Sequence, residues 1–147
     1  MIRRLLVISL SIALLAPAAW AFDSIDLTYL PNGGPCDGQF HEVEWKNTTG
    51  ATRTVTKVIV TGIGTPVVNG LPLVNTGVWS SEVKVEAADG TYKTIALAVE
   101  EAGKASAAST FDYPDGSVVV QPGESLVHKT FCNGTSVYYA WVYVLTR

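Results

Sequence analysis

The chain has 147 residues, a formal net charge of −3 and 48% hydrophobic residues. This length and composition are typical of one folded domain with a real core. The acidic balance, without a cluster of Lys and Arg, argues against nucleic acid and anionic membrane surfaces as partners.

The first 21 residues match a secretory signal peptide. Arg3 and Arg4 form a short basic region, Leu5 to Leu15 is apolar, and Ala19-Trp20-Ala21 is an A-x-A cleavage site. We expect cleavage to leave one domain, residues 22–147, in a secreted or periplasmic protein with no membrane insertion after removal of the signal. The short basic region favours a bacterial source.

The two cysteines stand near the two ends of the mature chain. They are Cys36 and Cys132, and no C-x-x-C motif is present. Two cysteines in an oxidising compartment are expected to pair, so we predict one structural disulfide. A bridge closing so large a loop could contribute about 4–5 kcal/mol on the loop-entropy model.

Turn dipeptides divide the mature chain into short segments rich in Val, Ile, Thr, Tyr and Trp. Asn-Gly and Asp-Gly tolerate the positive φ of tight hairpin turns. They stand at residues 32–33, 37–38, 69–70, 89–90, 115–116 and 133–134. This pattern predicts an all-β fold, an antiparallel two-sheet β-sandwich of immunoglobulin-like or jelly-roll type.

In chain order, strands are expected at residues 24–30, 40–47, 53–61, 78–87, 91–100, 117–121 and 125–132, before a closing strand. In 40–47, alternation places His41, Val43 and Trp45 on one face and carboxylates on the other. The strands 78–87 and 91–100 form the clearest hairpin. There we expect Trp79, Val83 and Val85 to point inward, together with Ile95, Leu97 and Val99.

Two stretches depart from the strand pattern. Residues 62–77 are rich in Gly and Pro and predict a β-hairpin excursion or a long loop. Residues 101–109 are rich in Ala and Ser and predict a connecting loop or a single helical turn. Neither stretch has the composition of an interdomain linker.

The catalytic inventory is small, which predicts a protein that is not an enzyme. A serine hydrolase needs an activated Ser beside a His, but no G-x-S-x-G motif accompanies His41 and His128. No residues have the spacing of a metal site, and no cofactor is indicated. A small hydrolase with two carboxylates stays as a minor alternative, with candidates Glu42, Glu44, Glu82, Glu86 and Glu100.

Two tripeptides fit the N-glycosylation pattern. Residues 47–49 read Asn-Thr-Thr and residues 133–135 read Asn-Gly-Thr. In a bacterial protein the pattern carries no information, whereas in a eukaryotic one it would mark exposed loops.

The closing strand is apolar on both of its faces. Alternation places Val137, Tyr139, Trp141, Tyr143 and Leu145 on one face, and Tyr138, Ala140, Val142 and Val144 on the other. One face must line the core, and three coverings remain open for the second. Residues 62–77 could cover it, a sugar could stack on Tyr139, Trp141 and Tyr143, or a protein partner or second copy could bind it.

The last 14 residues and the general layout resemble the subunits of chaperone–usher pili. Those are secreted one-domain β-sandwiches with one disulfide, and a chaperone pairs with their apolar C-terminal strand. Gly134 stands where that family often has a Gly. The chain departs from the pattern at Cys132, since the family's disulfide lies in the N-terminal half, and at Thr146, where a Tyr is common. We do not assign the chain to that family.

Together these features predict a non-catalytic domain that acts in protein–protein binding or in extracellular or envelope assembly. Self-association or a protein partner is the first expectation. A carbohydrate-binding module that uses the aromatic face of the closing strand is the alternative.

Overall fold

The computed structural model describes residues 22–29, 38–63, 67–68, 71–72, 78–100, 106–133 and 139–147. The expected signal peptide and Cys36 lie outside these ranges. The strands are β1 (Asp23–Asp26), β2 (Phe40–Lys46), β3 (Arg53–Ile63), β4 (Val67–Val68), β5 (Leu71–Pro72), β6 (Val78–Glu86), β7 (Tyr92–Glu100), β8 (Ser106–Asp112), β9 (Val118–Val120), β10 (Ser125–Asn133) and β11 (Tyr139–Thr146).

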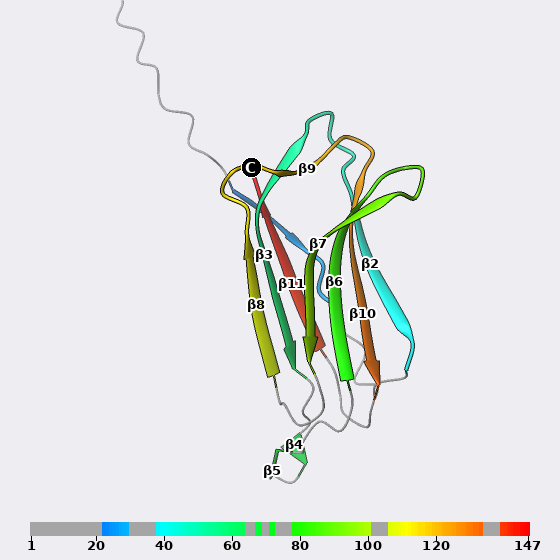
Figure 1. Ribbon diagram of the computed structural model, residues 1–147, viewed down its shortest axis with the longest axis vertical. Coiled ribbons are helices and arrows are strands. Elements are labelled where there is room, and N and C mark those ends of the chain that lie inside the picture. Colours follow the sequence, from blue (N-terminus) through cyan, green and yellow to red (C-terminus); the bar gives the residue numbers. More distant parts are fainter. Residues whose placement is uncertain are drawn as a thin grey trace, which may run out of the picture.

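Two antiparallel sheets pack as a sandwich, so the expected all-β class is confirmed (Figure 1). One sheet has the order β1-β11-β3-β8, with β9 also paired to β3. The other has the order β2-β10-β6-β7. The short pair β4–β5 lies beyond the lower end of both sheets in Figure 1.

The strand pairings are nested along the chain. β1 pairs with β11, β2 with β10, β3 with β8 and β6 with β7, as if one long hairpin had been folded back on itself. Two further pairings, β3 with β11 and β6 with β10, join the arms of this hairpin side by side. Most contacts therefore join residues far apart in sequence, which is typical of slowly folding β proteins.

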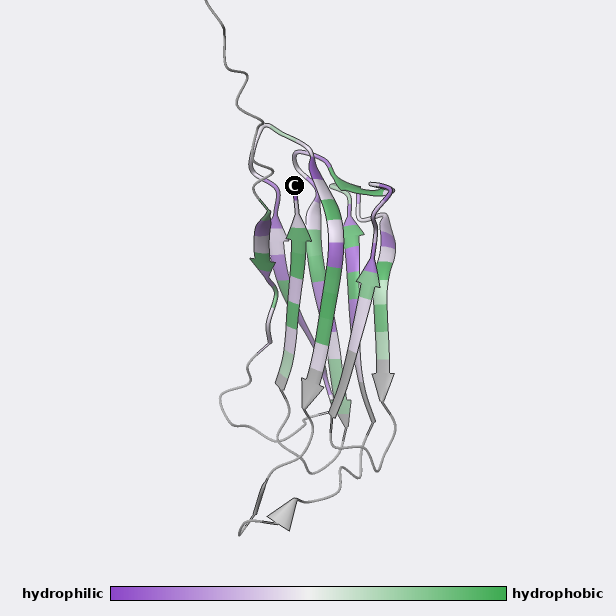
Figure 2. Cartoon of the chain, turned by 90° about the vertical axis from the view of Figure 1, so that its left-hand side faces the viewer, coloured by the Kyte–Doolittle hydropathy of each residue, from purple (hydrophilic) through white to green (hydrophobic). Residues whose placement is uncertain are grey.

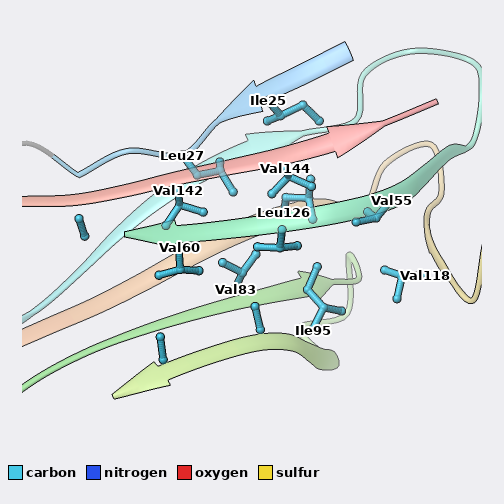
Figure 3. Close-up of a cluster of buried hydrophobic side chains, with 14 of the residues drawn as sticks. Ile25, Leu27, Val55, Val60, Val83, Ile95, Val118, Leu126, Val142 and Val144 are labelled. Carbon is cyan, nitrogen blue, oxygen red and sulfur yellow. The ribbon is translucent and has the colours of Figure 1, made fainter. Parts of the chain in front are cut away.

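The core lies between the two sheets and consists mainly of aliphatic side chains (Figure 3). Each strand contributes alternate residues, because successive side chains of a strand point to opposite faces. Figure 2 shows the resulting alternation of hydrophobic and hydrophilic bands. The fully buried members are Leu27, Val55, Val58, Val60, Val83, Val120, Leu126, Ala140, Val142 and Val144, each with 0% exposure.

The expected hairpin between β6 and β7 is confirmed. Its turn places Gly90 at φ 83°, a conformation that costs a residue with a Cβ atom. The Ala87 N–H donates to the Thr91 carbonyl at 2.8 Å. The Asp89 carboxylate accepts both the Thr91 N–H and its hydroxyl, so the Asp-Gly dipeptide fixes the turn locally.

The expectation that Leu97 points inward was wrong, since Leu97 is 55% exposed. The register between β6 and β7 shifts between Val83 and Lys84, where β7 holds one extra residue. A bulge of this kind moves the following side chains to the opposite face of the sheet. Ile95, the extra residue at the shift, and Ala96 and Ala98 after it are therefore the buried residues described in β7.

The expectation for residues 101–109 was wrong over its second half. Residues 106–109 belong to β8, which pairs with β3 over Lys57–Ile63. Ala and Ser have low intrinsic strand preference, but pairing along a long neighbouring strand overrides it. Residues 101–105 lie outside the described part of the chain.

Two aromatic contacts close the corners where the sheets meet. Tyr29 follows β1 and stacks on His41 of β2, with ring centroids 4.7 Å apart and an interplanar angle of 17°. At the opposite corner, the Tyr113 hydroxyl after β8 donates to the Ile95 carbonyl of the edge strand β7. Each contact joins one sheet to the other.

His128 joins the two sheets inside the core. Its side chain has 0% exposure and points from β10 toward the segment that follows β1. Nδ1 lies 2.7 Å from the Leu27 carbonyl oxygen, which can only accept, so Nδ1 carries the proton. Nε2 then accepts from the Ser81 hydroxyl at 3.0 Å. The neutral ring is fully hydrogen-bonded without water.

We expect acid to destabilise the fold through His128. Burial lowers its folded-state pKa, outweighing the opposite effect of the Leu27 carbonyl, whereas unfolding returns it to about 6.5. The unfolded chain then binds the proton more readily. The contribution of His128 is therefore fully present above about pH 6.5 and is lost as the pH falls through the lower folded-state pKa.

Urea unfolding at about pH 8 and about pH 5 tests this. The wild type should lose stability at the lower pH, while His128→Gln should be less stable overall but lose less on acidification. His41→Gln is the matched control. An equal loss in His128→Gln and in the wild type would contradict this role.

Asn47 is buried, with 1% exposure, so its tripeptide does not mark an exposed loop. Its amide nitrogen donates to the carbonyls of Val120 and Ala51 at 2.9 and 3.0 Å. Its amide oxygen accepts from the Thr49 hydroxyl. This single side chain ties the end of β2 to β9 and to the loop before β3.

Asn47→Ala should lower the free energy of unfolding by about 2 kcal/mol or more, since it leaves buried carbonyls without donors. Thr48→Ala, at the exposed neighbouring residue, should change it by less than about 0.5 kcal/mol. Urea denaturation of both variants measures the difference. Equal stabilities would refute the role of Asn47 as a tie.

Candidate functional site

The closing strand lies inside a sheet, with neighbours on both sides. β11 pairs with β3 from Tyr139 to Thr146 and with β1 from Tyr143 to Thr146. Beyond β1, the Leu27 and Tyr29 N–H groups donate to the carbonyls of Val142 and Ala140 at 2.8 and 2.9 Å. Both hydrogen-bonding edges of β11 are occupied within the sheet. The strand pairing that the pilus-subunit resemblance implies is therefore not supported.

The two faces of β11 have different environments. Ala140, Val142 and Val144 line the core with 0% exposure. On the opposite face, Tyr143 is 37% exposed, and Trp141 and Leu145 are half-buried. The Tyr139 side chain and Val137 lie outside what the structure describes. The sequence interpretation of two distinct faces is thus supported for Ala140–Leu145.

A neighbouring strand extends the outer apolar surface. Ile59 of β3 stands directly opposite Tyr143, and Thr61 opposite Trp141, so these side chains share one face. Ile59 is half-buried. We call the surface formed by Ile59, Trp141, Tyr143 and Leu145 the β11 face.

A shallow cavity of about 380 Å³ continues the β11 face toward the C-terminal end of β11. It lies around Leu145, and its apolar walls include Phe22 and Pro114. Phe22 is 62% exposed and would be the first residue after signal cleavage. Sequence reasoning missed both Ile59 and this cavity, because they join β11 only through long-range pairing.

An ion pair and a carboxylate stand at the margin of the β11 face. Lys57, which stands opposite Leu145, has its Nζ 3.1 Å from Asp112 Oδ1. The Asp26 carboxylate, beside Tyr143 on β1, accepts the Thr28 N–H at 2.9 Å. An exposed ion pair of this kind contributes little to stability, but it cancels the charges of Lys57 and Asp112.

The outer face of the other sheet carries a network of ion pairs. Lys84 lies 3.0 Å from Glu86 and 3.9 Å from Glu42, and its side chain is only 11% exposed. The hydrogen bond to Glu86 raises the pKa of Lys84 more than burial lowers it. Lys129 also contacts Glu42, and Glu82 accepts the Thr94 hydroxyl. Ion pairs cover part of this face, and Phe40, Tyr92 and Leu97 are exposed on it as well.

The residues weighed for catalysis do not converge on a site within the described chain. His41 packs on Tyr29 at a corner, and His128 lies in the core beside Ser81 without an opening to solvent. Glu42, Glu82 and Glu86 are engaged as described above, and Glu44 accepts the Ser125 hydroxyl. The Glu100 side chain lies outside the described part.

Among the residues that the structure describes, no group of three or more His, Cys, Asp or Glu side chains is placed to hold a metal ion. No described helix is long and apolar enough to cross a membrane.

The described part of residues 62–77 does not cover the β11 face. β4 and β5 form the expected hairpin, which lies beyond the lower end of the sheets in Figure 1 rather than across the β11 face. The remainder of this stretch, apart from residues 62–63 of β3, lies outside the description.

Comparison with known proteins finds structural likeness to a viral chain, at low similarity. No family model matches the chain, and no curated protein matches it. A chain in the structure of infectious bursal disease virus Gx strain aligns with 86% of this chain, at 11% identity and a TM-score of 0.38. The alignment spans 31% of that viral chain.

Proposed function

We propose that this chain is a secreted or periplasmic, non-catalytic domain that binds protein through the β11 face. The observation that carries the proposal is the half-exposed row of Trp141, Tyr143 and Leu145 beside Ile59. Aromatic side chains at the centre and polar groups at the margin are the usual anatomy of a protein interface.

The proposed occupant is a second copy of the chain. The ion pair Lys57–Asp112 cancels two of the charges at the margin, which leaves little charge there for an oppositely charged partner. Interfaces between identical subunits are more apolar than transient ones, and two-fold dimers are the commonest oligomers. A two-fold axis through the face would place the same apolar row against itself.

Tyr143→Ala and Trp141→Ala should shift the mature protein from dimer to folded monomer, because both remove apolar contact area at the centre of the face. Light scattering after gel filtration measures the mass, and circular dichroism verifies the fold. Tyr92→Ala is the matched control, since Tyr92 is 62% exposed on the charged sheet. The control should keep the mass of the wild type.

A wild type that stays monomeric at high concentration would refute self-association. A dimer that both variants retain would place the interface elsewhere.

Carbohydrate binding on the same face is the second candidate. Trp141 and Tyr143 are alternate residues of one strand, about 7 Å apart along it, and sugar rings stack on such side chains. In that case the protein is a monomer whose Trp fluorescence changes with sugar. Loss of this fluorescence change in Trp141→Ala, with the solution mass of the protein unchanged, would favour this candidate over self-association.

The jelly-roll fold is the finer architecture that we propose. The nested pairings, closed by β3–β11 and β6–β10, support it. A jelly roll is a long antiparallel hairpin rolled into two sheets of four strands each, and these eight paired strands fit that scheme. An immunoglobulin-like sandwich would instead keep more consecutive strands as neighbours in one sheet.

The Cys36–Cys132 disulfide remains part of the proposal. Cys132 is buried on β10, and its carbonyl accepts the Gly38 N–H at 3.0 Å. Gly38 follows Cys36 by two residues, so the chain there is within reach of a disulfide.

Digestion without reductant should yield a peptide pair joining Cys36 and Cys132 in the mass spectrum. The double variant Cys36→Ser/Cys132→Ser should unfold at a lower urea concentration. Its free energy of unfolding should fall by up to about 4 kcal/mol. Free thiols in the native oxidised protein would contradict the pairing.

A further inference from the structure

A cleft of about 350 Å³ lies at the end of the sandwich opposite β4–β5, away from the β11 face. One side is the end of the β6–β7 hairpin, and the other is the segment from residue 117 to residue 124 around β9. The two sides belong to different sheets, so the fold itself holds them facing each other. A volume of this size suits a small ligand.

The floor of the cleft is apolar. It is lined by Val85 of β6 and by Ala87, which follows that strand, and by Val118 and Val119 of β9. Val118 is 4% exposed and belongs to the core, whereas Val119 is 37% exposed. An apolar ring face can therefore bury against fixed strands without rearranging the core.

Two polar side chains at the margin are already oriented. Glu124 accepts the Gln121 N–H through Oε2 at 2.8 Å, which leaves Oε1 as an acceptor. The Gln121 amide oxygen accepts the Thr52 hydroxyl at 2.7 Å, which leaves the amide NH₂ as a donor. Oriented groups lose little freedom when a ligand binds.

The charges around the cleft balance. Lys93 is the cation among the lining residues and Glu124 is the anion. Hydrogen bonds from Ser117 lower the pKa of Asp115, and the charge of Lys93 adds to this effect, which places its ammonium near the turn before β9. Exposed charges hold a ligand weakly, so hydrogen bonding must supply the specificity.

We propose that this cleft binds one neutral sugar ring or a cyclic polyol of similar size. A hydroxyl group donates to Glu124 and accepts from Gln121 or Lys93, whereas the C–H face of the ring covers the valines. A charged ligand would be repelled by whichever of Lys93 and Glu124 has the same sign of charge. The site is separate from the β11 face and does not depend on the proposed association.

Saturation-transfer NMR of the mature protein tests the proposal with the methyl glycosides of glucose, galactose, mannose and N-acetylglucosamine. At least one should receive saturation. Gln121→Leu should abolish the transfer and Lys93→Ala should weaken it, while Lys46→Ala, an exposed strand lysine outside the cleft, should leave it unchanged. Amide spectra of each variant verify the fold.

No transfer to any of the four glycosides would overturn the proposal. Transfer that survives Gln121→Leu but is lost in Trp141→Ala would also overturn it, because it would place the sugar on the β11 face. Failure of dimerisation leaves this test unaffected, so the two proposals can fail independently.

Discussion

The placement of β11 between β1 and β3 determines most of this structure. Because β11 forms hydrogen bonds along both of its edges, it joins β1 and β3 into one sheet. Its inward residues Ala140, Val142 and Val144 fill the core, and the same alternation forces Trp141 and Tyr143 outward. The apolar outer surface is thus a direct consequence of a sequence that is apolar at every position of this strand.

The two sheets are joined by hydrogen bonds and by an aromatic stack as well as by aliphatic packing. His128, Tyr29 and Tyr113 each make a contact that crosses from one sheet to the other. Buried hydrogen bonds specify which strands meet, because leaving such a group unpaired costs more than its bond contributes. The outer faces differ, since the ion pairs around Lys84 lie on one sheet and the row of Trp141 and Tyr143 lies on the other.

Alternation and turn dipeptides in the sequence predicted those features that depend only on neighbouring residues. The Asp89-Gly90 turn, the outward carboxylates of β2 and the two faces of β11 all followed from alternation and turn chemistry. The remaining features depend on pairing between strands that are distant in the sequence. The bulge opposite Val83 exposed Leu97, and pairing with β3 made a strand of residues 106–109. The neighbour Ile59 and the cleft beside Gln121 exist only once distant strands meet, so no local pattern contains them.

The central claim is that the β11 face is open within one chain and covered by a second. Hydroxyl-radical footprinting of Tyr143 and Trp141 over a dilution series measures this directly. We predict strong labelling at the lowest concentration and protection as the concentration rises, while Tyr92 stays labelled throughout. Labelling of Tyr143 that is weak at every concentration would show that its own chain covers the face. Strong labelling at every concentration would show that no second copy does.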